Sequence, residues 1–320
     1  MNISEINIYP IKSLKGISLD AATVEERGLR HDRRWMLTTP DGMFFTQREF
    51  PKMATLSVWI EEDGSGLGVA ADRFGDVFVP IKPDTGNKQQ VTIWQSVCEG
   101  EVYGGALNEW FSDVIETKCQ LVYMPDDSRR SVNPRFDRGS EVVSFADGYP
   151  LMVLSEASLE DLNGRLAANT NLPPRHRSHH PVTEAVPPLL GQEGSQNEQG
   201  GELFEPLPMN RFRPNIVVSG SEAYAEDDWK SIRIGDAEFR STKPCERCVI
   251  TTVDQAKGDF AGKEPLKTLA AYRMAQTVMP DRLAELGFSE NVVLFGQNLI
   301  AETTGANIRV GDECQIISTF

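Results

Sequence analysis

The residues with the clearest chemical potential are two cysteines, Cys245 and Cys248, within the stretch 243–254. Arg247 directly precedes the second cysteine, and a neighbouring guanidinium favours the thiolate form of a cysteine. Residues 249–253 form a run rich in β-branched side chains, which predicts a buried strand that starts at Cys248. A thiol held at the entrance of a strand suits a metal ligand or a nucleophile.

Four interpretations of this cysteine pair are open. A structural zinc site needs four ligands, but the other cysteines, Cys98, Cys119 and Cys314, stand isolated in the sequence. A thioredoxin-like redox motif needs its cysteines at a helix N-terminus, whereas this pair leads into a predicted strand. The third interpretation is two buried cysteines that act as small hydrophobic residues. The fourth is a single thiolate ligand to a metal whose other ligands come from a bound organic cofactor.

Two basic clusters near the N-terminus could bind an anion. Lys12 and Ser13 follow a proline that ends a predicted strand, so an ammonium group and a hydroxyl are presented on a loop. Arg33 belongs to a second cluster, residues 30–34, whose guanidinium groups can bind phosphate oxygens in a fork. The spacing alone is more typical of two solvated surface clusters than of an anion site.

Polar residues also stand beside three predicted elements of the second half. Arg213 and Asn215 lead into a strand at residues 216–218 and lie on one side of it, because strand side chains repeat every two residues. They can bind a phosphate and the edge of a heterocycle, or they can tie the strand to its loop. Ser155 or Ser158 caps a predicted helix whose first backbone N–H groups are free to bind an anion, although capping alone explains a serine there.

The elements that must position these residues are mainly strands. Strands are predicted at residues 3–9, 34–38, 44–47, 56–60, 68–71, 77–80, 91–93, 142–145, 151–154, 216–218, 237–240 and 292–300. Helices are predicted at residues 106–115, after residue 155 or 158, and at residues 265–274. An arginine-containing segment, residues 129–138, is interpreted as a solvated loop. Residues 172–208 are rich in Pro, Gly, Gln and Ser, which predicts a disordered insert with three histidines.

Size and charge limit the possible partners. A chain of 320 residues fits two domains, and its net charge of −15 argues against general binding to nucleic acid or to anionic membranes. The N-terminus shows no basic flank followed by an apolar segment, so we expect no signal peptide and no membrane anchor. Five cysteines do not form an even disulfide framework, and we therefore expect a reducing, cytoplasmic location.

The motif Cys-x-Arg-Cys-x-x-Thr-Thr-Val-Asp at residues 245–254 resembles the central motif of the MOSC domain, the molybdenum-cofactor sulfurase C-terminal domain. The likeness extends along the chain, in the order seen in YcbX-like proteins and the mitochondrial amidoxime-reducing component. The similar segments are residues 9–13, 31–35, 145–150, 154–158, 211–215, 263–266 and 295–298. No single segment is decisive, but the ordered set is specific.

The resemblance implies a mainly β fold of the α+β class. An N-terminal MOSC β-barrel-like domain is expected at residues 1–120, followed by a MOSC β-barrel domain at residues 121–320 with a few short helices. The implied cofactor is molybdenum cofactor, in which the metal is bound by a pterin dithiolene, oxo groups and one protein thiolate. That thiolate is assigned to Cys248, with Cys245 as a structural neighbour. A family-level association with pyridoxal phosphate comes with the same resemblance.

The resemblance also implies the roles of other residues. Lys12, Ser13 and Arg33 are placed at the anionic end of the molybdopterin, with Asp32 orienting an arginine. Asn298 is a candidate for substrate contact near the metal. The remaining residues expected to bind the cofactor are Ser155, Arg213, Asn215, Glu246 and Arg247.

The function implied is the reduction of N-hydroxylated compounds, such as hydroxylaminopurines and amidoximes. The chain shows no flavin, haem or iron–sulfur signature, so a separate flavin or iron–sulfur protein is expected to supply electrons. Some YcbX-like chains continue into a 2Fe-2S ferredoxin domain, which is not expected here. A non-catalytic carrier of molybdenum cofactor, or a sulfur relay through the two thiols, is the alternative.

Overall fold

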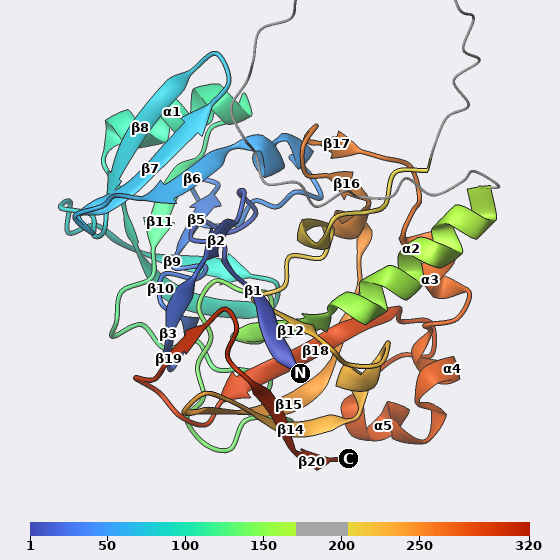
Figure 1. Ribbon diagram of the computed structural model, residues 1–320. Helices are drawn as coiled ribbons and strands as arrows, with labels where there is room; N and C mark the ends of the chain where they lie inside the picture. The colour runs from blue at the N-terminus through green and yellow to red at the C-terminus, as the bar shows by residue number, and fades with distance from the viewer. Residues whose placement is uncertain (171–203) are drawn as a thin grey trace, which may run out of the picture.

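The largest element of the computed structural model, which describes residues 1–170 and 204–320, is a mixed eight-stranded sheet (Figure 1). Its strand order is β2-β1-β13-β12-β18-β15-β14-β20, and only the β12–β13 pair is parallel. The strands are β1 (Asn2–Ile8), β2 (Ile17–Leu19), β12 (Leu151–Ser155), β13 (Ile216–Ser219), β14 (Trp229–Ile234), β15 (Ala237–Glu246), β18 (Leu294–Ala301) and β20 (Cys314–Thr319). The mainly β prediction is confirmed.

The central strands of this sheet are buried on both faces. Alternating residues point to opposite sides, so Val153 of β12 joins a core with Ile6 and Leu299, while Leu154 packs against helix α2 (Glu156–Thr170) through Leu162. Burial on both faces explains why β12 is a nearly continuous apolar run rather than an alternating one.

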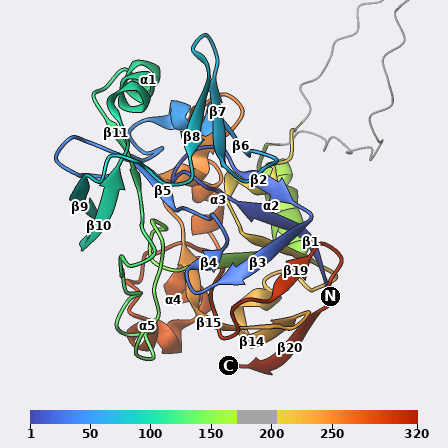
Figure 2. The same ribbon diagram turned by 90° about the vertical axis from the view of Figure 1, so that its left-hand side faces the viewer.

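Two smaller sheets and a helix form the other end of the molecule (Figure 2). A four-stranded sheet runs β5-β11-β10-β9, and a three-stranded one runs β6-β7-β8. Their strands are β5 (Trp35–Thr38), β6 (Ser57–Ile60), β7 (Gly66–Ala71), β8 (Gly75–Pro80), β9 (Lys88–Ile93), β10 (Ser96–Val102) and β11 (Gln120–Tyr123). Helix α1 (Gly105–Ile115) buries Phe111 in the same core as Trp35, as the helical spacing at residues 106–115 predicts.

The first thirty residues form strands that pair with strands from the second half of the chain. Strands β1 and β2 belong to the large sheet, and β3 (Ala21–Glu25) pairs with both β4 (Gly28–Leu29) and β19 (Asn307–Arg309). Figure 2 shows β3 beside β19 at the edge of the molecule. The loop that follows β1 is therefore placed against segments from the second half.

The remaining elements are short. They are β16 (Val253–Asp254), β17 (Asp259–Phe260), α3 (Leu266–Ala270), α4 (Ala275–Val278), α5 (Leu283–Leu286) and the 3-10 turns η1 (Pro51–Thr55), η2 (Met209–Arg211), η3 (Ala225–Asp227), η4 (Val249–Thr252) and η5 (Pro280–Arg282). The helix predicted at residues 265–274 is shorter than expected. None of the helices in the described ranges is long and apolar enough to span a membrane.

The strand predicted at residues 249–253 is wrong. Residues 249–252 form the 3-10 turn η4, and the Val249 side chain is 41% exposed. The threonines of the motif explain the turn, because Thr251 Oγ1 donates to the Cys248 carbonyl at 3.0 Å and Thr252 Oγ1 donates to the Val249 carbonyl at 2.8 Å. Cys248 therefore follows the long strand β15 instead of starting a new one.

Two other predicted strands are absent, and a predicted insert lies mostly outside the described residues. The strands predicted at residues 44–47 and 142–145 are absent, and each segment makes only an isolated bridge, Thr38 with Phe44 and Ser131 with Val142. The predicted insert, residues 172–208 with its three histidines, lies mostly outside the described residues.

Candidate functional site

A cavity of about 990 Å³ opens where the end of β15 meets loops from both halves of the chain. Most residues proposed from the sequence line it. They are Lys12, Ser13, Arg33, Arg213, Asn215, Glu246, Arg247, Cys248 and Asn298. They come from five separate parts of the sequence. The pairing of β1, β13, β18 and β15 in one sheet brings four of these parts together, and the loop before β5 adds Arg33.

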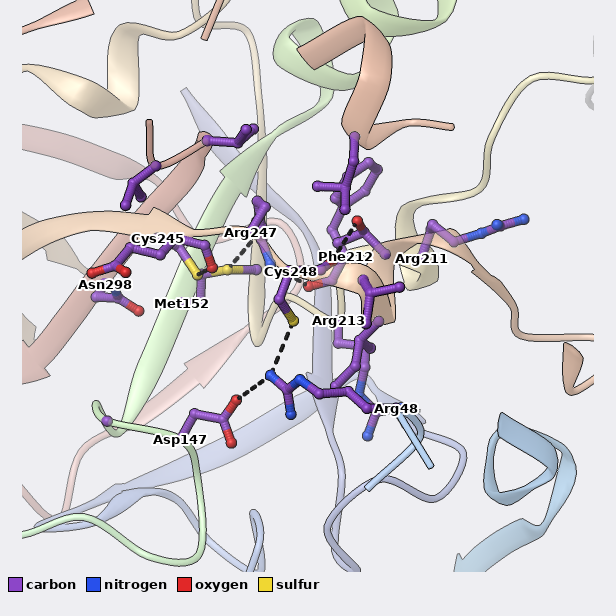
Figure 3. A pocket seen from close by; sticks show the side chains of 18 of the residues that line it. Arg48, Asp147, Met152, Arg211, Phe212, Arg213, Cys245, Arg247, Cys248 and Asn298 are labelled. Atoms are coloured by element: carbon purple, nitrogen blue, oxygen red, sulfur yellow. Dashed lines mark hydrogen bonds and ion pairs between the residues drawn. The ribbon is translucent and has the colours of Figure 1, made fainter. Parts of the chain in front are cut away.

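The Cys248 thiol lies near the middle of this cavity (Figure 3). Its backbone is extended, with φ −126° and ψ −179°, and it immediately precedes turn η4. Arg48 Nη2 donates to Cys248 Sγ at 3.0 Å, and the same nitrogen lies 3.5 Å from the Asp147 carboxylate. The guanidinium at the thiol is thus that of Arg48, and the expectation that Arg247 fills this place is wrong.

Arg247 instead ties three segments together under the thiol. Its Nε donates to the Phe295 carbonyl at 2.7 Å, its Nη1 to the Phe212 carbonyl at 3.1 Å, and its Nη2 contacts Met152 Sδ at 2.7 Å. Gly296 permits this arrangement: its φ is +82°, and a Cβ there would lie 3.4 Å from Arg247 Nη2. Arg247 lines the cavity with its stem while its guanidinium is occupied by protein acceptors.

Two further guanidinium groups lie on Tyr9. The Arg33 and Arg213 guanidinium carbons are 4.4 and 4.1 Å from the Tyr9 ring centroid. Burial, together with repulsion from Arg33, lowers the pKa of Arg213 to about 10, and burial raises that of Tyr9 to about 12. Among the described residues no carboxylate pairs with Arg213, so an anionic ligand would relieve the repulsion.

Arg33 is oriented as the sequence suggested. The buried Asp32 accepts from Arg33 Nη1 at 2.5 Å and from the Tyr9 backbone N–H at 2.8 Å. The same Arg33 nitrogen donates to Asn215 Oδ1 at 3.0 Å, and Asn215 Nδ2 donates to the Asn7 carbonyl at 3.1 Å. Asn215 therefore joins β1 to the arginine cluster at the wall of the cavity.

Lys12 and Asp147 form a second charged pair at the cavity wall. Lys12 Nζ donates to the Phe145 carbonyl at 2.8 Å and contacts the Asp147 carboxylate. Burial lowers the pKa of Lys12 to about 8, although Asp147 opposes the shift. Burial opposes the ionisation of Asp147, but Lys12 and Arg48 outweigh it and hold the pKa of this carboxyl below its usual range.

The loop that carries Asp147 is fixed by an arginine expected on the surface. Arg130 is only 4% exposed, and it donates to the carbonyls of Ser144, Ala146 and Asp147 at 2.7, 2.6 and 2.8 Å. The prediction of a solvated loop is therefore wrong for this residue. Its guanidinium supplies the hydrogen bonds that a strand would have supplied at residues 144–147.

Several residues of the cavity wall have a left-handed backbone. The φ angles of Ser13, Arg33, Trp94 and Arg213 are +69°, +49°, +55° and +56°. This conformation is costly for residues other than glycine, by about 1–3 kcal/mol each, and such strain concentrates at binding sites. The strain turns three residues that could bind an anion towards the same space.

Of two further residues predicted for the site, Asn298 lines the cavity and Ser155 does not. Asn298, on β18, lines the cavity and donates from Nδ2 to the Lys243 carbonyl at 3.1 Å. Ser155 does not line it: the side chain is fully buried and caps α2 by accepting from the Ser158 N–H at 3.1 Å. The buried Glu226 carboxyl group accepts hydrogen bonds from both serine hydroxyls, at 3.0 and 2.7 Å, so a side chain of the protein itself already occupies this helix start.

Sequence reasoning missed Arg48 and Trp94. Arg48 Cζ lies 4.6 Å from the Trp94 ring centroid, and both residues line the cavity. Arg48 follows a predicted strand that is absent, and Trp94 lies in the turn between β9 and β10, where a tryptophan is unusual. An aromatic residue at a tight turn was the signal that could have indicated Trp94.

The donor set fits a metal carried by an anionic organic ligand. Within residues 1–170 and 204–320, no three His, Cys, Asp or Glu side chains come together to form a metal site. Cys248 can therefore supply one thiolate, while a bound organic molecule supplies the other ligands. Lys12, Arg33 and Arg213 provide the positive charge that an anionic end of that molecule requires.

Comparison with known proteins agrees with this arrangement. Residues 1–118 match the MOSC N-terminal beta barrel domain, and residues 140–315 match the MOSC domain. Mitochondrial amidoxime-reducing component 1 of Mus musculus is 32% identical over 98% of this chain and 82% of its own length, and that of Homo sapiens is 30% identical over the same shares. Molybdenum cofactor sulfurase of Arabidopsis thaliana is 31% identical over 85% of this chain and 31% of its own length.

Proposed function

Because this chain belongs to the MOSC-domain family, with amidoxime-reducing components among its relatives, we propose that it is a molybdenum-cofactor-dependent oxidoreductase that reduces N-hydroxylated compounds. The observation that carries the proposal is the position of the Cys248 thiol, inside a cavity whose wall presents Lys12, Arg33 and Arg213. A metal-binding sulfur and an anion-binding wall share one space.

The overall reaction proposed is the cleavage of the N–O bond. The substrate nitrogen keeps its bonds to the rest of the molecule, the oxygen leaves as water, and two electrons and two protons are consumed. When bound, the cofactor supplies the site for oxygen removal and for electron acceptance. A separate flavin or iron–sulfur protein is proposed as the electron source.

The protein residues bind and orient. Cys248 is proposed as the metal ligand, and Lys12, Ser13, Arg33 and Arg213 as the groups that bind the anionic end of the cofactor. Asn215 and Glu246 contribute polar groups to the same wall, and Arg247, next to Cys248 in sequence, binds the backbone carbonyls of Phe295 and Phe212. Asn298, on the adjoining strand β18, is proposed to contact the substrate.

A second candidate function is a carrier of molybdenum cofactor or a sulfur relay. The observation that favours it is that Cys245 and Cys248 line the same cavity, together with the similarity to molybdenum cofactor sulfurases. Burial raises the pKa of the Cys245 thiol, although Arg247 opposes the shift. A thiol with a raised pKa is a poor nucleophile at neutral pH, which favours the enzyme over the relay.

A reduction assay distinguishes the two. Protein isolated from a host that makes molybdenum cofactor is supplied with reduced flavin or a viologen dye and with benzamidoxime or hydroxylaminopurine. The proposal expects benzamidine or the aminopurine as product. A protein that contains the cofactor but forms no product with any N-hydroxylated compound would favour the carrier.

The cellular setting belongs to the same proposal. We propose a reducing, cytoplasmic location, supported by five cysteines that are all unpaired. Removal of toxic N-hydroxylated bases would suit that location. Fractionation of cells that express the native protein tests it, and the association with pyridoxal phosphate stays a prediction.

A further inference from the structure

Arg48 holds its guanidinium between a thiol and a carboxylate at the cavity. Its Nη2 contacts Cys248 Sγ at 3.0 Å and lies 3.5 Å from the Asp147 carboxylate, while the Trp94 ring covers its guanidinium carbon at 4.6 Å. Its Nη1 is buried, and within the described part of the chain no acceptor bonds it. Figure 3 shows the guanidinium between the thiol and the carboxylate.

Elements far apart in the sequence fix this guanidinium. The residue before it, Gln47, is fully buried and donates to the Ser13 carbonyl at 2.7 Å, so the backbone at Arg48 is anchored. Trp94 lies on the β9–β10 turn with φ +55°, and Phe44 packs against its ring at 5.0 Å in an edge-on orientation. Asp147 is fixed in turn by Lys12, as described above. The guanidinium therefore has a defined position beside Cys248.

Arg247 offers a direct comparison within the same cavity wall. All three of its nitrogens contact protein groups, at 2.7, 3.1 and 2.7 Å. The Nη2 of Arg48 is less fully engaged: it carries two N–H groups, it contacts the Cys248 sulfur at 3.0 Å, and the Asp147 carboxylate lies 3.5 Å away. Arg48 can therefore donate from Nη2 to a ligand in the cavity.

Resting on the proposed function, we propose that Arg48 binds the oxygen of the substrate's N–O group through Nη2, and that Trp94 is the positioning residue for Arg48. The oxygen of an N-hydroxylated compound accepts a hydrogen bond beside Cys248, where the N–O bond must break. The reduced product has no such oxygen. Amidoximes are neutral and their amidine products are cationic, so a permanent positive charge here also favours the substrate over the product.

Paired binding measurements on the cofactor-loaded protein test the role of Arg48. Calorimetry gives the Kd of benzamidoxime and of benzamidine for the wild type, Arg48→Gln and Arg48→Lys. We expect Arg48→Gln to weaken benzamidoxime binding by about 10- to 100-fold, the range for a hydrogen bond to a charged donor. Benzamidine binding should stay unchanged or become tighter. Arg48→Lys should recover part of the loss, since a charged donor remains.

Molybdenum content and a matched control separate this role from a structural one. Arg129→Gln removes an exposed arginine that pairs with Glu26, and it should change neither Kd. Arg48→Gln should keep the wild-type molybdenum content. Equal weakening of both ligands, no weakening of benzamidoxime, or a loss of molybdenum in proportion to the lost binding would each overturn the assignment. Binding is measured without turnover, so it reports on Arg48 independently of the reduction assay. A wild type that binds benzamidoxime but reduces no substrate would refute the proposed function, and the Kd values would still test the role of Arg48.

Trp94 is tested in the same assay. Trp94→Ala removes the ring that covers Arg48 and should weaken benzamidoxime binding by about 3- to 10-fold, in line with a cation–π contact. Trp94→Phe should restore most of the affinity. In an Arg48→Gln background, Trp94→Ala should add nothing, because the residue it positions is gone. A full additional loss in that background would show that Trp94 acts independently of Arg48.

Discussion

Arg48 and Cys248 are 200 positions apart in the sequence, and the guanidinium of the first lies 3.0 Å from the sulfur of the second. The pairing unites a loop of the first half of the chain with the end of β15 in the second half. Arg247, the neighbour of Cys248 in sequence, turns away to bind the carbonyls of Phe295 and Phe212. The chemistry of the thiol is thus set by tertiary structure and not by the adjacent residue.

A substitution of Cys245 distinguishes the proposed enzyme from the alternative sulfur relay. Cys245→Ser should leave the reduction of benzamidoxime within about twofold of the wild type, because Cys248 is the proposed metal ligand and the half-buried Cys245 thiol has a raised pKa. The measurement is kcat/KM per bound molybdenum. A loss as large as that caused by Cys248→Ser would support a dithiol relay.

Lys12 should make anion binding depend on pH. Its pKa is lowered to about 8, so in the empty protein its charge is lost as the pH rises through that value. Affinity for inorganic phosphate should therefore fall by roughly 2- to 10-fold between pH 7 and pH 9.5, within the range of a single partly screened charge. Lys12→Arg should flatten the profile, because arginine stays protonated throughout.

The same shift affects stability with a defined sign. The folded pKa of Lys12 lies below the unfolded value of 10.5, so between about pH 8 and pH 10.5 the unfolded chain holds more protons at this group. The contribution of Lys12 to the free energy of unfolding should rise across that window. Lys12→Met removes the titration, and urea denaturation of both proteins at several pH values measures the difference. A difference that stays constant with pH would refute the shift.

Ser155 should matter for stability and not for the cofactor. Ser155→Ala removes the cap of α2 and one hydrogen bond to the buried Glu226, which should lower the free energy of unfolding by about 1–3 kcal/mol. Molybdenum content per folded protein should not change. A selective loss of cofactor with normal stability would restore the interpretation drawn from the sequence.

Gly296 should be intolerant of a side chain for two reasons. At φ +82°, Gly296→Ala pays a backbone cost, and the new Cβ would lie 3.0 Å from the Val153 carbonyl oxygen and 3.4 Å from Arg247 Nη2. Gly305→Ala is the matched control, with φ +84° and no atom within 4 Å of the added Cβ. Gly296→Ala should be less stable than the control by about 1–2 kcal/mol in urea denaturation. Equal losses would show that the contact with Arg247 is unimportant.

The sequence indicated most of the cavity wall because its motifs are local. Lys12 and Ser13 follow a strand that ends at a proline, and Arg213 and Asn215 alternate into a buried strand, so each pair is presented on one side of the chain. Such short-range rules place side chains relative to their own strand. Helical spacing also predicted α1, and a short apolar run predicted β12.

The failures are cases in which a tertiary or side-chain contact overrides the local pattern. The β-branched run after Cys248 folds into η4 because the hydroxyls of Thr251 and Thr252 bond back to the chain. Ser155 stands at the start of helix α2, but its hydroxyl donates to Glu226, which lies 71 positions further along the chain. Arg48 shows no periodicity or motif, and only the folded structure brings it to the thiol.

The molybdenum and pterin content of Cys248→Ser tests the central claim most directly. Both proteins are produced in one host that makes molybdenum cofactor, and their metal is measured by mass spectrometry and their pterin by fluorescence after oxidation. We predict about one molybdenum per wild-type chain and loss of most of it in Cys248→Ser, with urea stability unchanged within about 1 kcal/mol, as for most substitutions outside the core. A wild-type protein free of molybdenum and pterin, or a variant that retains both in full, would contradict the assignment of this thiol.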